Sequence, residues 1–108
     1  MAVRRRERAV IPTFEEAARS VHAAHAASWK NRKHAAQWIN TIAEYVFPAL
    51  GDRRVDHIDT PDVLRVLSPI WLAKPETARR VRQRIRTVLD WAKAAGYRAG
   101  DRHGGQEI

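Results

Sequence analysis

The chain contains no cysteine, which excludes disulfides, thiolate-bound zinc and cysteine nucleophiles. It also lacks an apolar run of about 18 residues, the length that a membrane-spanning helix needs. The apolar stretch 9–11 after the basic N-terminus is broken by Pro12 and is too short for a secretory signal. Only His22 and His25 are spaced to share a metal, and no third ligand accompanies them. We therefore expect a cytoplasmic protein with no metal, no other cofactor and no membrane interaction.

Acidic residues are few in comparison with basic ones. The 108 residues include 12 acidic and 20 basic side chains, which gives a net charge of +8. Nucleic acid is the favoured acidic partner, although charge alone also allows an anionic membrane surface or an acidic protein. The length suits one domain, predicted over residues 13–98. Residues 1–12 and 99–108 are predicted to be flexible tails. The basic residues of the first tail either contact phosphates or belong to a linker; they are Arg4, Arg5, Arg6 and Arg8.

Apolar residues recur at helical spacing in four segments, so the sequence predicts an all-α fold with about four helices. The first helix is predicted over residues 13–27, opened by a capping box between Thr13 and Glu16. The second begins at residue 31 or 32 and ends at Val46, because the residue before Pro48 disfavours helix. The inner stripe of the first helix includes His25, which is expected to be packed or partly buried.

A loop over residues 48–59 is expected next, held to the core by its apolar side chains Leu50, Val55 and Ile58. The third helix is predicted to begin with Thr60 as N-cap and Pro61 in the first turn. Ser68-Pro69 is predicted to end it. Its expected inner residues are Val63, Leu64, Val66 and Leu67. Residues 70–72 then form an apolar linker.

The fourth helix carries the strongest charge signal of the chain. It is predicted from Pro75 to about Ala95 and is closed by Gly96, which accepts the left-handed conformation at a helix end. Six basic residues and one acidic residue fall within residues 74–86. The apolar residues between them form one stripe: Ala78, Val81, Ile85, Val88, Leu89 and Ala92. One face therefore packs, and the other is cationic enough to attract a phosphate backbone.

These elements, with the motifs at residues 13–18, 47–52, 58–64 and 74–85, resemble the core-binding domain of phage-type tyrosine recombinases, the integrases. The resemblance spans roughly residues 13–98. It implies a SAM-like helical bundle that forms one half of a clamp around double-stranded DNA at an attachment-site core, in DNA integration and recombination. Other recombinase protomers are implied as partners on the DNA.

The resemblance also implies a second half of the clamp, a catalytic domain with a tyrosine nucleophile. We expect that domain to be absent from this chain, so the chain is expected to bind DNA without acting as an enzyme. No catalytic residue is assigned, and neither Tyr45 nor Tyr97 lies in the motif of a recombinase nucleophile. The alternatives are a helical module that binds other proteins and a truncated integrase remnant.

Predicted DNA contacts lie at the starts of the second and fourth helices. A helix N-terminus offers free N–H groups and a favourable dipole to a phosphate. Arginine grips phosphate or reads guanine, and glutamine reads adenine. The alternative is a solvated face whose long stems cover the core. The predicted contacts are Lys30, Asn31, Lys33, His34 and Gln37 in the first set, and Lys74, Thr77, Arg79, Arg80, Gln83 and Arg84 in the second. In the second set, Arg79 and Gln83 are expected beside a face formed by the other four.

Three tryptophans are expected to pack and not to stack on bases. Trp38 falls on an apolar helix face, Trp91 lies at the edge of a stripe, and Trp71 is in the apolar linker. Trp29 stands at the junction between a loop and a helix, and its role stays open.

Overall fold

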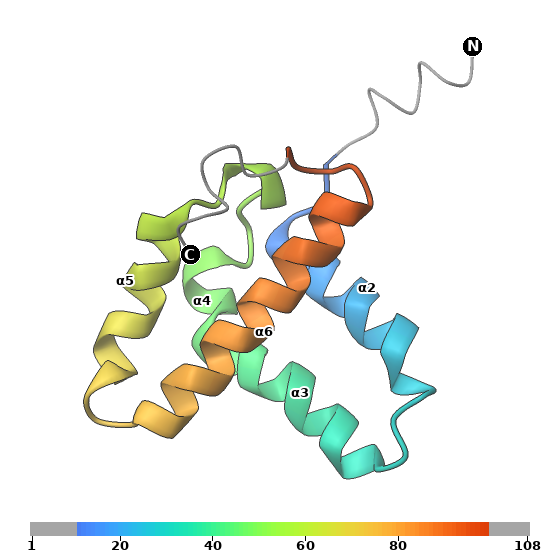
Figure 1. Cartoon of the computed structure of the whole chain (residues 1–108), viewed down its shortest axis with the longest axis horizontal. Helices are drawn as coiled ribbons and strands as arrows, with labels where there is room; N and C mark the ends of the chain where they lie inside the picture. The colour runs from blue at the N-terminus through green and yellow to red at the C-terminus, as the bar shows by residue number, and fades with distance from the viewer. Residues whose placement is uncertain (1–10, 100–108) are drawn as a thin grey trace.

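Helices make up the part of the chain that the computed structural model describes, residues 11–99 (Figure 1). No strand forms in this part, so the all-α prediction is confirmed. The arginines of the predicted N-terminal tail and nearly all of the predicted C-terminal tail lie outside the described residues. The elements are α2 (Phe14–Ala26), α3 (Arg32–Tyr45), α4 (Phe47–Leu50), the 3-10 turn η1 (Val55–His57), α5 (Thr60–Trp71) and α6 (Pro75–Ala94).

The first helix starts as its sequence predicts. The Thr13 backbone N–H donates to Glu16 Oε1 at 3.0 Å, and the Glu16 N–H donates to Thr13 Oγ1 at 3.1 Å. These two bonds satisfy N–H groups that have no partner inside the helix. At the other end of the chain, Gly96 closes α6 with a φ of 87°, and the Tyr97 N–H bonds back to the Ala92 carbonyl. Both predicted caps are confirmed.

The predicted bounds of the third helix are wrong at both ends. Asp59, and not Thr60, is the N-cap of α5, because the Asp59 N–H finds an acceptor in Asp62 Oδ2 at 2.9 Å. The helix also continues through Pro69 to Trp71. Proline removes one N–H and leaves the carbonyl of Arg65 without it, but Arg65 is exposed and water can replace that bond. The predicted linker is therefore the last turn of α5.

The predicted loop between α3 and α5 contains the short helix α4 and the turn η1. Leu50, Val55 and Ile58 are each at most 1% exposed, so they hold the segment to the core as predicted. Gly51 packs tightly here, because a Cβ atom at this position would lie 2.7 Å from the Phe47 carbonyl oxygen. An extended contact joins the segment to the start of α2, where the Val55 N–H donates to the Pro12 carbonyl at 3.0 Å.

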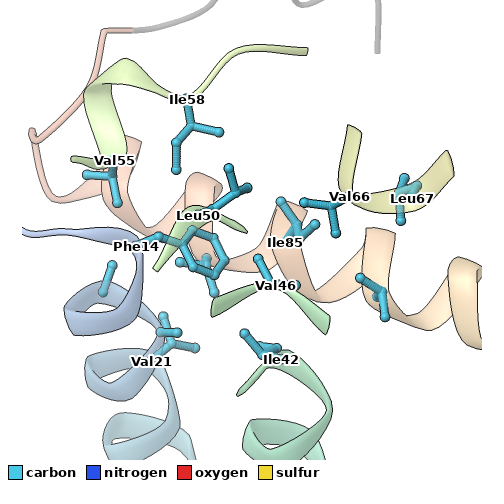
Figure 2. Packing of buried hydrophobic residues seen from close by; sticks show 14 of the residues in the cluster. Phe14, Val21, Ile42, Val46, Leu50, Val55, Ile58, Val66, Leu67 and Ile85 are labelled. Atoms are coloured by element: carbon cyan, nitrogen blue, oxygen red, sulfur yellow. The ribbon is translucent and has the colours of Figure 1, made fainter. Parts of the chain in front are cut away.

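The core lies where α6 crosses the other helices. Figure 1 shows α6 running between α5 on one side and α2 and α3 on the other. In Figure 2, Phe14 from α2 and Ile85 from α6 point into the same interior as Val46 and Leu50. Phe14 is fully buried and meets the Phe47 ring edge to face at 6.3 Å. Burying one such side chain stabilises the fold by about 1.5–3 kcal/mol.

Two apolar expectations outside this core are wrong. Leu64 and Trp71 on α5 are 53% and 49% exposed, although the sequence predicts packing for both. α5 packs mainly against α6, so only a narrow arc of its surface is covered. His25 on α2 packs on the Trp29 ring as predicted, but it is exposed and does not lie on the buried stripe. Trp38, by contrast, is 7% exposed and belongs to the core as predicted.

Candidate nucleic-acid interface

Two side-chain contacts set α3 and α6 side by side. Arg84 Nη1 on α6 lies 3.5 Å from the Gln37 carbonyl oxygen on α3, a long hydrogen bond. Lys74 Nζ, at the start of α6, lies 5.9 Å from the centre of the Tyr45 ring at the end of α3. Residue 37 thus lies near residue 84, and residue 45 lies near residue 74, and Figure 1 shows that α6 and α3 cross in this region and diverge toward the α2–α3 turn. The two predicted regions therefore lie on neighbouring helices.

Four predicted residues follow this contact along α6, and we call them the seam row: Lys74, Thr77, Arg80 and Arg84. Their spacing of three or four residues keeps them on one side of the helix. The row is about 15 Å long at 1.5 Å per residue. Thr77 and Arg84 are half-buried beside α3, whereas Lys74 and Arg80 are exposed. The structure thus brings together the four residues that the sequence places on one face.

Positive charge accumulates along the seam row. Burial lowers the pKa of Arg84, and the positive charge of Arg80 lowers it further. Arginine nevertheless stays protonated in proteins. Within residues 11–99, no carboxylate lies within ion-pair distance of Lys74, Arg80 or Arg84. An external anion that approached the row would relieve this repulsion.

A second set of α6 residues lies beside the seam row, and we call it the outer flank. Its residues line a shallow hollow: Arg79, Arg82, Gln83, Arg86, Thr87 and Asp90. Arg79 pairs with Glu76 at 3.2 Å, and Arg86 approaches Asp90 at 3.9 Å. Arg79 and Gln83, predicted beside the contact face, line this hollow, and the residues of the seam row do not. The charge of Arg79 is already partly balanced by Glu76.

The start of α3 is more closed than the sequence suggests. Asn31 Oδ1 accepts the backbone N–H groups of Lys33 at 2.9 Å and of His34 at 3.2 Å. The expectation of free N–H groups is therefore wrong for these two residues, because the Asn31 cap occupies them. Lys30, Lys33 and His34 are exposed at this end. Attraction for a phosphate here depends on the side-chain charges.

We group Lys30, which precedes α3, the α3 residues Lys33 and Gln37 and the seam row as one band, which we call the cationic surface. Lys33 and Gln37 are one helical turn apart, so they lie on the same side of α3. Gln37 then meets Arg84 across the gap between the helices. The sequence analysis missed Tyr45, whose ring supports Lys74. No pattern in the sequence links two residues 29 positions apart on different helices.

Other chemistry finds little support in the described part of the chain. No group of three or more His, Asp or Glu side chains in residues 11–99 is placed to hold a metal ion. None of the helices in this part is both long and apolar enough to cross a membrane. Tyr45 lies beneath Lys74, and the Tyr97 ring packs 5.8 Å from the Trp91 ring. Both tyrosine rings therefore pack against neighbouring side chains.

Comparison with known proteins agrees with this architecture. A family model described as the phage integrase central domain matches residues 14–104. Among solved structures, the solution NMR structure of protein Nmul_A0922 from Nitrosospira multiformis is similar, with a TM-score of 0.77 and 54% sequence identity. That match covers 82% of this chain and 84% of the other. A search of curated proteins found no match.

Proposed function

We propose that this chain, which belongs to the phage integrase central domain family, binds double-stranded DNA through its cationic surface during DNA integration and recombination. One observation carries the proposal: the five cations of the cationic surface on α3 and α6 have no carboxylate within ion-pair distance in residues 11–99. Such a band is the electrostatic footprint expected of a protein that neutralises phosphates. The role of the chain is binding, and strand cleavage is not assigned to it.

Within the band, the side chains differ in how firmly they are held. Lys74 and Arg84 each rest on α3, through the Tyr45 ring and the Gln37 carbonyl. A cation that is already oriented loses less conformational freedom on binding, so these two suit phosphate contacts that position the DNA. Arg80 stands exposed between them and is the best placed to reach a base edge.

The salt dependence of binding tests the electrostatic part directly. The cationic surface contains five cations: Lys30, Lys33, Lys74, Arg80 and Arg84. If each neutralises one phosphate, log K falls against log salt with a slope of about −4.5. Fluorescence anisotropy of a labelled duplex, titrated at several salt concentrations with random and candidate attachment-site sequences, measures this slope and any preference for sequence.

The deciding experiment is a charge reversal on each side of the same helix. The double variant Arg80→Glu/Arg84→Glu places two anions in the seam row and should weaken DNA binding by about 100-fold or more. The matched variant Arg82→Glu/Arg86→Glu makes the same change in net charge on the outer flank. It should weaken binding by about fivefold or less, through the change in the overall field.

Equal losses in the two double variants would mean that only net charge matters, and the assignment of the interface would be wrong. Absence of binding at low salt by the unmodified chain would remove the proposed function altogether. Circular dichroism of both variants shows whether the helices persist, so that loss of binding is not confused with loss of folding.

A protein-binding role is the second candidate, and the exposed apolar residues of α5 favour it. Leu64, Trp71 and Leu72 are 53%, 49% and 88% exposed, and they line a shallow groove. Apolar side chains gathered in this way often mark a contact with another protein. Another recombinase protomer on the same DNA is the partner we propose. Replacing Arg80 and Arg84 with glutamate should leave such a contact intact.

A further inference from the structure

Trp29 is the centre of a ring cluster at the turn between α2 and α3. Its ring lies 6.0 Å from His22, 6.1 Å from His25 and 5.6 Å from His34, measured between ring centres. Trp38 closes the cluster from the core side at 5.8 Å. Three of the five histidines of the chain therefore surround one indole, next to the start of the cationic surface.

His22 and His25 are held differently. His22 is half-buried, with Nε2 3.0 Å from the Ala35 carbonyl oxygen and its ring stacked on Trp38. This histidine joins α2 to α3 and is structural. His25 is exposed, and its Nδ1 donates to the Val21 carbonyl at 3.1 Å, which leaves Nε2 available for a second proton.

His25 lies in the last turn of α2, and its ring stacks on Trp29 at an interplanar angle of 22°. His34 lies in the first turn of α3 and meets the same indole edge to face.

The other charged groups around His25 are cations. The turn and the first residues of α3 contribute Lys30, Arg32 and Lys33, and α3 adds His34. On α2, the carboxylates Glu15 and Glu16 lie in the first turn, at the far end, where they bond to Arg19 and Thr13. At α6, Lys74 and Arg84 contact α3, and Asp90 and Lys93 lie toward the C-terminal end of α6. Figure 1 shows that end away from the α2–α3 turn.

Protonation of His25 therefore lacks an internal counter-charge. In the described part of the chain, the histidine with a carboxylate within ion-pair distance is His57, which lies 3.9 Å from Asp56 in η1. A phosphate bound at the start of α3 would supply that counter-charge, so DNA binding and proton uptake favour each other.

We infer that His25 is an additional DNA-contacting residue, and that DNA binding at the α2–α3 turn takes up a proton there, so that affinity rises as the solution becomes slightly acidic. This inference depends on the proposed DNA-binding function. Histidine is the side chain whose ordinary charge change falls between pH 5 and 8. A unit charge about 6 Å from a phosphate charge strengthens binding by about threefold in water.

The test measures the affinity of the full chain for one labelled duplex at pH 5.5, 6.5 and 7.5, at constant ionic strength. The variants are His25→Gln and His57→Gln, which lose the same type of group at opposite ends of the molecule. We expect affinity to rise by about threefold more between pH 7.5 and 5.5 in the unmodified chain and in His57→Gln than in His25→Gln. At pH 7.5, the three proteins should differ little.

NMR titration of the histidine ring protons provides the second readout. The His25 signals should shift at a higher pH in the presence of DNA than in its absence, and those of His57 should not. The same pH dependence in all three proteins, or unchanged His25 signals, would overturn the inference. Binding without this pH dependence would refute the inference alone, whereas no binding at any pH would refute the proposed function.

Discussion

Two charged regions of this small bundle differ in whether their arginines have a carboxylate partner. At the start of α5, Asp62 is 7% exposed, and its carboxylate forms ion pairs with Arg53 at 3.3 Å and Arg65 at 3.2 Å. It also accepts a hydrogen bond from the Asp59 N–H at 2.9 Å. We call this group the Asp62 corner. Along the cationic surface, Arg80 and Arg84 have no carboxylate within ion-pair distance in residues 11–99.

The difference separates the cations that the fold pairs with a carboxylate from those that we propose contact DNA. In the Asp62 corner, hydrogen bonds and opposite charge offset the cost of burying a carboxylate. On the cationic surface, like charges approach one another without such compensation, which destabilises the isolated protein slightly. Charge that the fold leaves unbalanced in this way is available to phosphates.

Removing the carboxylate from the corner should give the largest change in stability. Asp62→Ala takes away the acceptor of the Asp59 N–H and the partner of two arginines. The free energy of unfolding should fall by about 2 kcal/mol, measured by urea denaturation at pH 7. DNA affinity at a temperature where the variant stays folded should change by less than about threefold.

Asp52→Ala is the matched control, because Asp52 is an exposed aspartate nearby. Its effect on the free energy of unfolding should stay within about 0.5 kcal/mol. Equal effects of the two changes would show that burial and bonding at Asp62 contribute little to the free energy of unfolding. Stability would then no longer distinguish the two regions.

The sequence predicts the cationic region better than it predicts the corner. Helical spacing alone places Lys74, Thr77, Arg80 and Arg84 on one face, because one helix determines their relation. The bonds of Asp62 depend on Arg53, nine positions earlier on another segment. The sequence suggests Asp62 only as a residue of a first helical turn.

Long-range packing explains the other differences. The sequence predicts burial of Leu64 in its third helix and packing of Trp71 in an apolar linker. The number of neighbours around a helix decides how wide its buried face is, and α5 is covered mainly by α6. The contact between Gln37 and Arg84 crosses 47 positions, so each set of predicted contacts is visible in the sequence while their joining is not. Asn31 is close in sequence to the N–H groups that it caps, but its side chain closes the start of α3 only in the folded turn.

Adding a carboxylate to the cationic surface should make it resemble the corner. Gln37→Glu places an anion on α3 near Arg84 and should weaken DNA binding by about tenfold, because it repels phosphate and offsets one cation. Stability should be unchanged or higher by a few tenths of a kcal/mol. Fluorescence anisotropy and urea denaturation measure the two effects.

Gln83→Glu provides the comparison on the outer flank, where the same change lies near Arg79 and Arg86. It should weaken binding by about threefold or less. A larger loss for Gln83→Glu than for Gln37→Glu would move the DNA to the outer flank of α6.

Removing a single cation should change DNA binding less than the substitutions above, and the change should differ between the two regions. Lys33→Ala should weaken binding by about fivefold for every duplex sequence and should make the salt slope shallower by about one unit. Arg54 is the control, because its guanidinium already bonds Asp56 at 2.8 Å through Nη2 and at 3.0 Å through Nε. Arg54→Ala should leave the salt slope unchanged, and a slope that changes equally in both variants would contradict the contrast.

Acid should remove the contribution of the Asp62 corner to the stability of the fold. The change in stability should be smallest near neutral pH. The hydrogen bond from the Asp59 N–H lowers the pKa of Asp62, and Arg53 and Arg65 lower it further. A carboxyl whose pKa is lower in the folded than in the unfolded chain stabilises the fold above its ordinary value of about 3.9. That stabilisation is lost as the pH falls through the folded-state pKa. Asp62→Asn should therefore be less stable than the unmodified chain at pH 7 and at pH 5, and the two should converge below about pH 4 in urea denaturation. A constant difference down to pH 2 would mean that the amide loses packing or geometry and not the charge, so that the corner would no longer be a charge-compensated counterpart to the cationic surface.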